Sequence, residues 1–201
     1  MLTFWYEFAS TYSYLSAMRV DRVASAAGVS LRWRPFLLGP IFGAQGWGPS
    51  PFTLCPKKGA YMWRDLARRA AAQGLPPITQ PDPFPQNGLT AARVATLGLG
   101  QGWGAEFTRA AFQAQFAEGR SISDAAVLTG ILEGLGLPGS EILAQVAGDD
   151  TVKAALRHAT EEAMDAGLFG APSFTTPAGE LFWGDDRLED AIAWVKGRDI
   201  A

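Results

Sequence analysis

The sequence predicts an α/β protein in which a small mixed β-sheet is interrupted by a block of helices. Three observations support this fold class. The chain opens with a strand, helix, strand pattern; a long stretch from about residue 89 to 168 is almost entirely helical in pattern; and two short strands and a helix close the chain. With 201 residues, of which 48% are hydrophobic, the chain is long enough to bury a large core.

The opening pattern is a βαβ unit. The segment 2–8 is short and rich in aromatic residues, and apolar residues lie on both of its alternating faces. This pattern is typical of a strand buried in the middle of a sheet. Residues 11–27 contain no glycine or proline and favour one helix, with Ser10 or Thr11 as its N-cap. Residues 31–35 alternate apolar residues with arginines and end in proline, which predicts an edge strand.

The middle of the chain changes character twice. Residues 36–56 are rich in glycine and proline and show no periodicity, so we expect a long irregular loop that covers a site. A helix is expected from about 57 to 73, and a proline-rich passage over 76–85 has the composition of a domain crossing. Helical periodicity follows, and the helix over 107–116 is apolar on two sides, which predicts a central position.

The end of the chain completes the sheet. Two short strands are expected between residues 173 and 183, and a closing helix over 188–195. The order βαβ, helical block, ββα is the plan of the thioredoxin-like fold, a four-stranded mixed sheet interrupted by an all-helical insertion domain. We therefore expect a discontinuous thioredoxin-like domain of residues 1–77 and 169–201, with the insertion over 78–168.

Composition excludes several classes of function. Seventeen basic and 20 acidic residues give a net charge of -3, so we expect no nucleic-acid partner and no binding to an anionic membrane. No apolar run approaches the roughly 20 residues of a membrane span, and we expect a cytoplasmic protein that acts on small molecules. The single cysteine, Cys55, excludes an intramolecular disulfide, and the single histidine, His158, is expected on a solvated helix face.

Three positions at the ends of predicted elements are candidate site residues. Ser10 lies where the first strand ends and the first helix begins, so its hydroxyl either caps the helix or helps to bind an anion there. Pro172 follows Ala171 immediately before a short strand; a cis peptide bond there would turn backbone groups toward a peptide-like ligand, and an ordinary trans proline is the alternative. Asp185 and Asp186 begin the last helix, where carboxylates cap N–H groups or hold a ligand ammonium.

Three further residues have two interpretations each, and a fourth, Cys55, has one. Lys57 and Lys58 begin a helix, where cations are unfavourable, so they either pair with a ligand carboxylate or are a solvated pair. Glu7 is the only charge in the first strand and is either a buried acid or a group that reaches water. Cys55 has neither a second cysteine nor a histidine nearby, and we expect it to be incidental to function.

Four motifs taken together resemble the 2-hydroxychromene-2-carboxylate isomerases, relatives of kappa-class glutathione transferases and DsbA-like oxidoreductases. They are F-W-Y-E-F-A-S-T-Y-S-Y-L at the start, P-K-K-G-A-Y-M-W-R-D-L in the middle, and F-G-A-P-S-F and F-W-G-D-D-R-L near the end. The resemblance spans nearly the whole chain. It implies a bound glutathione, with Ser10 matching the serine that hydrogen-bonds the glutathione sulfur.

The resemblance also assigns the other candidates. It implies that Lys58 approaches the glycyl carboxylate of glutathione, and that Ala171, beside a cis Pro172, supplies backbone contacts to the cysteinyl unit. Asp185 and Asp186 match a polar pair near the γ-glutamyl end. Position 185 is aspartate where relatives often have asparagine or serine, which increases the local negative charge.

The implied activity is the interconversion of 2-hydroxychromene-2-carboxylate and trans-o-hydroxybenzylidenepyruvate, or of a related aromatic substrate, with glutathione as a catalyst. Trp47, Phe52 and Trp183 are candidates to line a pocket for such a substrate. The alternative activity is a kappa-like glutathione transferase or peroxidase, and a non-catalytic thiol-binding module is a third reading. A disulfide oxidoreductase is excluded because the chain has no C-x-x-C pair. Relatives are commonly dimers, so the resemblance implies a homodimer.

Overall fold

The computed structural model describes residues 1–46 and 55–197, and the sheet they contain has four strands. These are β1 (Leu2–Tyr6), β2 (Leu31–Pro35), β3 (Ser173–Thr175) and β4 (Leu181–Trp183), in the order β2-β1-β3-β4. β2 runs parallel to β1, and the other two pairings are antiparallel. The predicted four-stranded mixed sheet is confirmed, and so is the edge position of β2.

The aromatic residues of β1 explain why this strand is central. Phe4 lies opposite Trp33 of β2 and Phe174 of β3. Its ring centroid is 5.0 Å from that of Trp33 and 5.4 Å from that of Phe174. Rings at these separations add to the area buried between neighbouring strands. On the other face of β1, the ring centroids of Trp5 and Phe36 are 6.1 Å apart, so both faces of the strand are covered, as its continuous apolar pattern predicts.

The helix predicted over 11–27 is in fact two helices, α1 (Thr11–Ala17) and α2 (Val20–Ala26). The break falls at Arg19, whose backbone φ of -129° is not helical. Its guanidinium reaches the carboxylates of Asp185 and Glu189, which precede and begin the closing helix. Helix propensity alone did not reveal this tertiary contact.

The loop predicted over 36–56 contains a short helix that the sequence did not indicate, α3 (Leu38–Ala44). Its buried residue Ile41 is 3% exposed and packs with Trp5 and Phe36. One buried apolar residue in seven gives no detectable periodicity, which is why the helix was missed. The next described helix, α5 (Pro56–Ala72), agrees with the prediction for this part of the chain.

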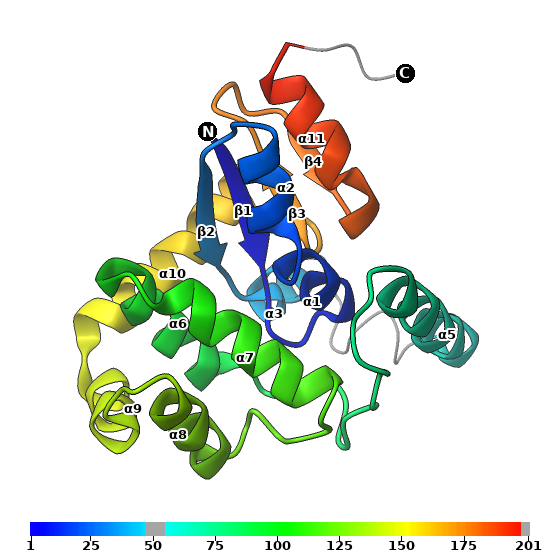
Figure 1. Ribbon diagram of the computed structural model, residues 1–201. Helices are drawn as coiled ribbons and strands as arrows, with labels where there is room; N and C mark the ends of the chain where they lie inside the picture. The colour runs from blue at the N-terminus through cyan, green and yellow to red at the C-terminus, as the bar shows by residue number, and fades with distance from the viewer. Residues whose placement is uncertain (47–54, 198–201) are drawn as a thin grey trace.

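The helical block and the closing elements follow in the predicted order. Their bounds are α6 (Leu89–Gln101), α7 (Gly104–Phe116), α8 (Ala125–Gly134), α9 (Gly139–Gly148), α10 (Asp150–Asp165), the 3₁₀ turn η1 (Asp185–Arg187) and α11 (Leu188–Val195). Figure 1 shows α6 to α9 gathered below the sheet, α11 beside its upper part, and α5 standing apart at the right. The site described below lies where α1, α5 and the start of η1 come together.

Helix α7 is the centre of the molecule, as its two apolar faces predict. Phe107, Phe112 and Phe116 are fully buried. The hydroxyls of Thr108 on α7 and Tyr6 on β1 are hydrogen-bonded at 2.9 Å. The apolar core is thus continuous from the sheet into the helical block, and the division into two separate domains stays a prediction.

The turn between α6 and α7 requires glycine. A Cβ placed on Gly104 would lie 2.3 Å from the backbone nitrogen of Leu99 and 2.7 Å from the carbonyl carbon of Gly98. Both neighbours are backbone atoms, which a rotamer change cannot move. This close approach lets α7 fold back against α6.

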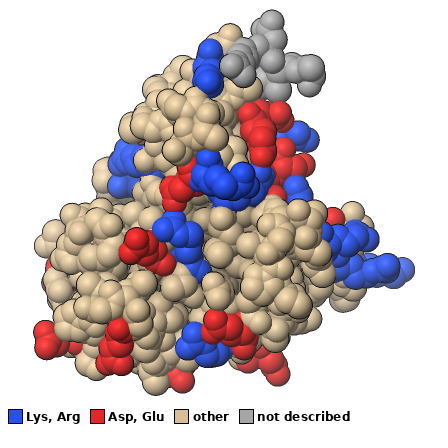
Figure 2. Space-filling view, viewed as in Figure 1, with Lys and Arg blue, Asp and Glu red and all other residues tan. Residues whose placement is uncertain are grey.

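The surface charges are mixed in sign. Figure 2 shows acidic and basic side chains interspersed over much of one face, with Lys and Arg gathered at the right-hand edge over α5. His158 is 66% exposed beside Glu161 and Glu162, so its predicted surface position is confirmed. Among the described residues, no helix is both long enough and apolar enough to cross a membrane.

Candidate active site

Ser10 and the Ala171–Pro172 peptide meet at one point, although 161 residues separate them. The Ser10 hydroxyl donates a hydrogen bond to the carbonyl oxygen of Ala171 at 2.8 Å. Its oxygen also accepts the N–H of Ser13 at 3.1 Å, which makes Ser10 the N-cap of α1. The Ala171–Pro172 bond is cis. The predicted cap and the predicted cis bond are both confirmed, and they are in direct contact.

The pairing of β1 with β3 creates this contact. Trp5 lies opposite Ser173, so the end of β1 and the start of β3 are neighbours. The turn after β1 is held by a hydrogen bond from the Ser10 N–H to the carbonyl of Glu7 at 3.0 Å. On the other side, the carbonyl of Pro172 accepts the N–H of Gly184 at 2.9 Å. One candidate segment is therefore held by a turn hydrogen bond at the end of β1, and the other by a hydrogen bond between the segments that flank β3 and β4.

A cavity of about 300 Å³ adjoins the cis peptide and gathers most of the predicted site residues. Its lining comprises Tyr12, Arg69, Ala171, Pro172, Trp183, Gly184, Asp185, Asp186 and Arg187. Four of these were predicted as binding residues from the sequence, and Trp183 was a candidate pocket residue. Tyr12 and Arg69 were not, because no motif in the sequence connects them with the cis peptide.

The two aspartates predicted as a pair have different surroundings. Asp185 is 1% exposed and faces two guanidinium groups, with Arg19 Nε at 3.1 Å and Arg69 Nη2 at 3.3 Å. It also accepts the Ser16 hydroxyl at 2.9 Å and the Gln73 amide at 3.5 Å. Asp186, by contrast, is 52% exposed at the cavity. The negative charge at position 185 is thus compensated from inside the protein.

Tyr12 and Arg69 are held together by Asp65 on α5. The Tyr12 hydroxyl donates to Asp65 Oδ2 at 3.0 Å, and Arg69 Nη1 lies 4.0 Å from the same oxygen. The Arg69 guanidinium also lies over the Tyr12 ring, 5.8 Å from its centroid. Burial, together with the bond to Asp65, raises the pKa of Tyr12, which keeps the phenol protonated as a donor.

Lys58 lies on the exposed first turn of α5, between Pro56 and Gly59, which line a second and larger cavity. Lys58 is eleven residues before Arg69, which is about 16 Å along a helix. The structure therefore does not bring Lys58 to the smaller cavity. Its assignment to the glycyl carboxylate stays a prediction.

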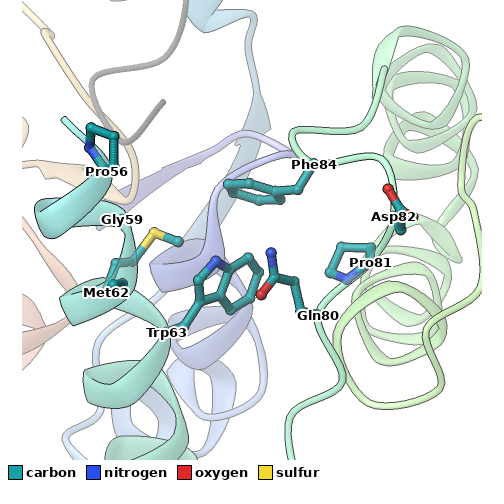
Figure 3. Close-up of a pocket in the computed structure, with 9 residues that line it drawn as sticks. Pro56, Gly59, Met62, Trp63, Gln80, Pro81, Asp82 and Phe84 are labelled. Carbon is teal, nitrogen blue, oxygen red and sulfur yellow. The ribbon is translucent and has the colours of Figure 1, made fainter. Parts of the chain in front are cut away.

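The larger cavity has a volume of about 690 Å³ and lies between α5 and the proline-rich passage. Figure 3 shows Trp63 and Met62 of α5 on one side, with Phe84, Gln80 and Pro81 on the other. The rings of Trp63 and Phe84 meet edge to face, with centroids 4.8 Å apart. The polar side chains of Gln80 and Asp82 also line this cavity, and aromatic walls with a few polar groups are typical of a site for a small aromatic molecule.

The aromatic residues predicted to line a substrate pocket have separate outcomes. Trp183 lines the smaller cavity and packs on Phe169, with ring centroids 4.9 Å apart. Trp47 and Phe52 lie outside the residues that the structure describes. Trp63 and Phe84 were not predicted, since an aromatic residue on an amphipathic helix and another between prolines carry no signal of a pocket.

Glu7 is the buried acid of the two sequence interpretations. Its side chain is 9% exposed, and Oε2 accepts the N–H of Ala9 at 2.8 Å. Burial raises the pKa of Glu7 to about 7, and the backbone hydrogen bonds at Ala9 and Ser10 oppose that increase. A group that changes charge near neutral pH therefore lies in the turn that carries Ser10.

Within the part of the chain that the structure describes, this site has neither a pair of cysteine thiols nor a cluster of metal-ligating side chains. Cys55, the single cysteine of the chain, is exposed at the start of α5. No group of three or more His, Cys, Asp or Glu side chains in residues 1–46 and 55–197 is arranged to hold a metal ion. What the site offers is a hydroxyl, a cis peptide carbonyl and a charged cavity beside them.

The fold and this site define a thioredoxin-fold protein of the DsbA type in which a serine follows the first strand. The family model of the DSBA-like thioredoxin domain matches residues 1–192. The chain is also 30% identical over 189 residues to a 2-hydroxychromene-2-carboxylate isomerase of Sphingobium xenophagum, with 94% of each chain covered. It belongs to the 2-hydroxychromene-2-carboxylate isomerase family of DsbA-like proteins.

Solved structures agree with this fold. A 2-hydroxychromene-2-carboxylate isomerase superposes with a TM-score of 0.86 at 24% identity, over 98% of this chain and 94% of the other. The cytosolic disulfide reductase DsbM of Pseudomonas aeruginosa with GSH has a TM-score of 0.64 at 17% identity, over 98% of this chain and 97% of that one. At these identities the structures establish the fold alone.

Proposed function

We propose that this protein is a glutathione-dependent isomerase that interconverts 2-hydroxychromene-2-carboxylate and trans-o-hydroxybenzylidenepyruvate, or a related aromatic substrate. The observation that carries the proposal is the contact of the Ser10 hydroxyl with Ala171 beside the cis Pro172. This contact puts a hydrogen-bond donor next to a peptide bond that lines the smaller cavity. A thiol-containing peptide fits that arrangement, and the family membership supports the isomerase activity.

The peptide bond between Ala171 and Pro172 supports the binding of glutathione through its cysteinyl unit. An extended peptide pairs with backbone N–H and C=O groups by strand addition. The Ala171 carbonyl accepts a hydrogen bond from the Ser10 hydroxyl. When the N–H of the ligand occupies that carbonyl, the Ser10 hydroxyl is released and turns toward the ligand sulfur. Ser10 then acts as a hydrogen-bond donor to the thiolate and not as a nucleophile.

Stabilising the thiolate is the chemical task of the site. A free thiol with a pKa near 8.5 is only a few per cent ionised at neutral pH, and the thiolate is the attacking species. Lowering the thiol pKa by about 2 requires about 2.7 kcal/mol in favour of the anion. One charge-assisted hydrogen bond contributes about 1.5–3 kcal/mol. The Ser10 hydroxyl is therefore sufficient in magnitude.

The two cavities give the ligands separate places. The smaller one, with its paired charges, suits the γ-glutamyl end of glutathione near Asp186, and Lys58 at the start of α5 suits the glycyl carboxylate. The larger cavity, with Trp63 and Phe84, suits the aromatic ring of the substrate. Helix α5 borders both cavities, so it connects the two binding sites.

The reaction conserves glutathione. The thiolate adds to the conjugated double bond of the ring-opened substrate, and the electron pair moves to the carbonyl oxygen as an enolate. The former double bond is then single and rotates. The enolate reforms the double bond and expels the thiolate, so no proton, electron or sulfur is lost in the cycle.

The stoichiometry of glutathione tests this proposal. Substrate should be converted many times per glutathione added, conversion should stop when glutathione is left out, and free thiol should remain constant throughout. Net loss of thiol into a conjugate or a disulfide would instead assign a kappa-like transferase or peroxidase. The cytoplasmic location and the homodimer implied by the resemblance stay predictions, and sedimentation of the purified protein tests the second of them.

A further inference from the structure

The charges around the smaller cavity match an amino acid zwitterion. Its lining includes two arginines, Arg69 and Arg187, and two aspartates, Asp185 and Asp186. The γ-glutamyl end of glutathione carries one ammonium and one carboxylate on the same carbon. A site for it needs one acidic group and one basic group that are not already neutralised by each other.

Of the two acids, Asp186 is the one available to a ligand. Asp185 is 1% exposed and already receives Arg19, Arg69 and the Ser16 hydroxyl. Asp186 is 52% exposed, and its nearest cation, Arg187, lies 3.7 Å away. The ligand ammonium is therefore expected at Asp186.

Of the two bases, Arg69 is the better anchor for the carboxylate. Arg187 is 53% exposed and pairs with Asp190 of the adjoining helix α11 at 3.0 Å. Arg69 is 30% exposed, whereas Arg68 beside it on α5 is 57% exposed. An ion pair is less screened at the more buried position. Arg69 is thus the more buried of these two neighbouring arginines.

The geometry of Arg69 leaves donors for a ligand. Its distances to Asp185 and Asp65 are 3.3 and 4.0 Å, which are ion-pair distances and longer than charge-assisted hydrogen bonds. The Tyr12 ring supports its guanidinium plane. A guanidinium has five N–H donors in a fixed fork that matches a carboxylate. These contacts fix the position of the fork without saturating it.

On the basis of the proposed function, we propose that Arg69 binds the α-carboxylate of the γ-glutamyl residue of glutathione, and that the buried Asp185 is a positioning residue that orients Arg69. Asp185 would then act on the ligand through Arg69. Asp185 and Arg69 would therefore act together, through the ion pair between them.

Calorimetric binding of two ligands tests the inference. One is glutathione, and the other is γ-aminobutyryl-cysteinyl-glycine, which lacks only the α-carboxylate. The wild-type protein should bind the second ligand about 10- to 100-fold more weakly, since one charge-assisted contact is lost. Arg69→Met should reduce glutathione binding by a similar factor, while its binding of the second ligand stays within about threefold of wild type.

A binding role and a structural role are separated by one ratio, the dissociation constant of γ-aminobutyryl-cysteinyl-glycine divided by that of glutathione. Asp185→Asn should lower this ratio, because a misplaced Arg69 discriminates less, whereas damage to the fold would weaken both ligands equally. Arg64→Met is the matched control, an exposed arginine on the same helix that lines neither cavity; it should leave the ratio unchanged. Arg69→Lys keeps a cation beside Asp185. Its ratio should therefore lie between that of the wild type and that of Arg69→Met.

The outcomes distinguish this inference from the proposed function. If the wild-type protein does not bind glutathione at all, both are wrong. If it binds glutathione and the ratio is the same in wild type, Arg69→Met and Arg69→Lys, the role of Arg69 is wrong and the proposed function stands.

Discussion

Replacing the buried acid Glu7 by glutamine should change how stability depends on pH. Burial raises the pKa of Glu7 from 4.5 to about 7 in the folded protein. Below pH 4.5 the group is protonated in both the folded and the unfolded state and contributes no difference. As the pH rises toward 7, only the unfolded chain ionises, so wild-type stability is progressively lost, and above pH 7 the full loss of about 3 kcal/mol is present.

The Glu7→Gln variant lacks this titration, so its stability relative to wild type should increase with pH. The linkage relation gives an increase of about 2.5 kcal/mol between pH 5 and pH 8, or about 5–10 °C in Tm for a chain of this size. Denaturant unfolding at a series of pH values measures it, and the exposed Glu133→Gln serves as the control. A difference between Glu7→Gln and wild type that is independent of pH would refute the reasoning.

Two other substitutions test the packing and the ion network. Gly104→Ala should destabilise the protein by about 1–3 kcal/mol, because its Cβ meets a backbone atom of Leu99. Gly100→Ala is the control, since a Cβ there meets nothing within 4 Å, and it should stabilise the protein slightly. Equal effects of the two substitutions in chemical denaturation would contradict the argument. Asp185→Asn should lower the free energy of unfolding by about 2–4 kcal/mol, because Arg19 loses its buried partner. At the exposed Asp186, the same substitution should change that free energy by no more than about 0.5 kcal/mol. Similar unfolding midpoints for the two variants would argue against a buried ion network.

The sequence was sufficient for the sheet and for the central helix α7, because these elements have strong local patterns. The aromatic run of β1 and the two apolar faces of α7 predict burial without knowledge of the fold. The break between α1 and α2 was not predictable, since the ion pairs of Arg19 with a segment 166 residues later are tertiary. Helix α3 was missed because it buries only Ile41.

The candidate site divides in the same way. Ser10 and Ala171 were identified through the family resemblance of the motifs that carry them, and the structure puts these two residues in contact. Arg69 and Tyr12 were not predictable, because the contacts between α5 and α1 are tertiary. The different burial of Asp185 and Asp186 was likewise not predictable, because two adjacent aspartates look the same in the sequence.

The most direct test of the account is the thiol pKa of bound glutathione, followed by the ultraviolet absorbance of its thiolate as pH is varied. In the wild-type complex this pKa should lie about 2 below that of the free thiol, and Ser10→Thr, which keeps the hydroxyl and the helix cap, should preserve the lowered pKa. In Ser10→Ala the pKa should return toward the free value and turnover should fall with it. An unchanged thiol pKa in Ser10→Ala, in a variant that still binds glutathione, would contradict the central claim that this serine stabilises the thiolate.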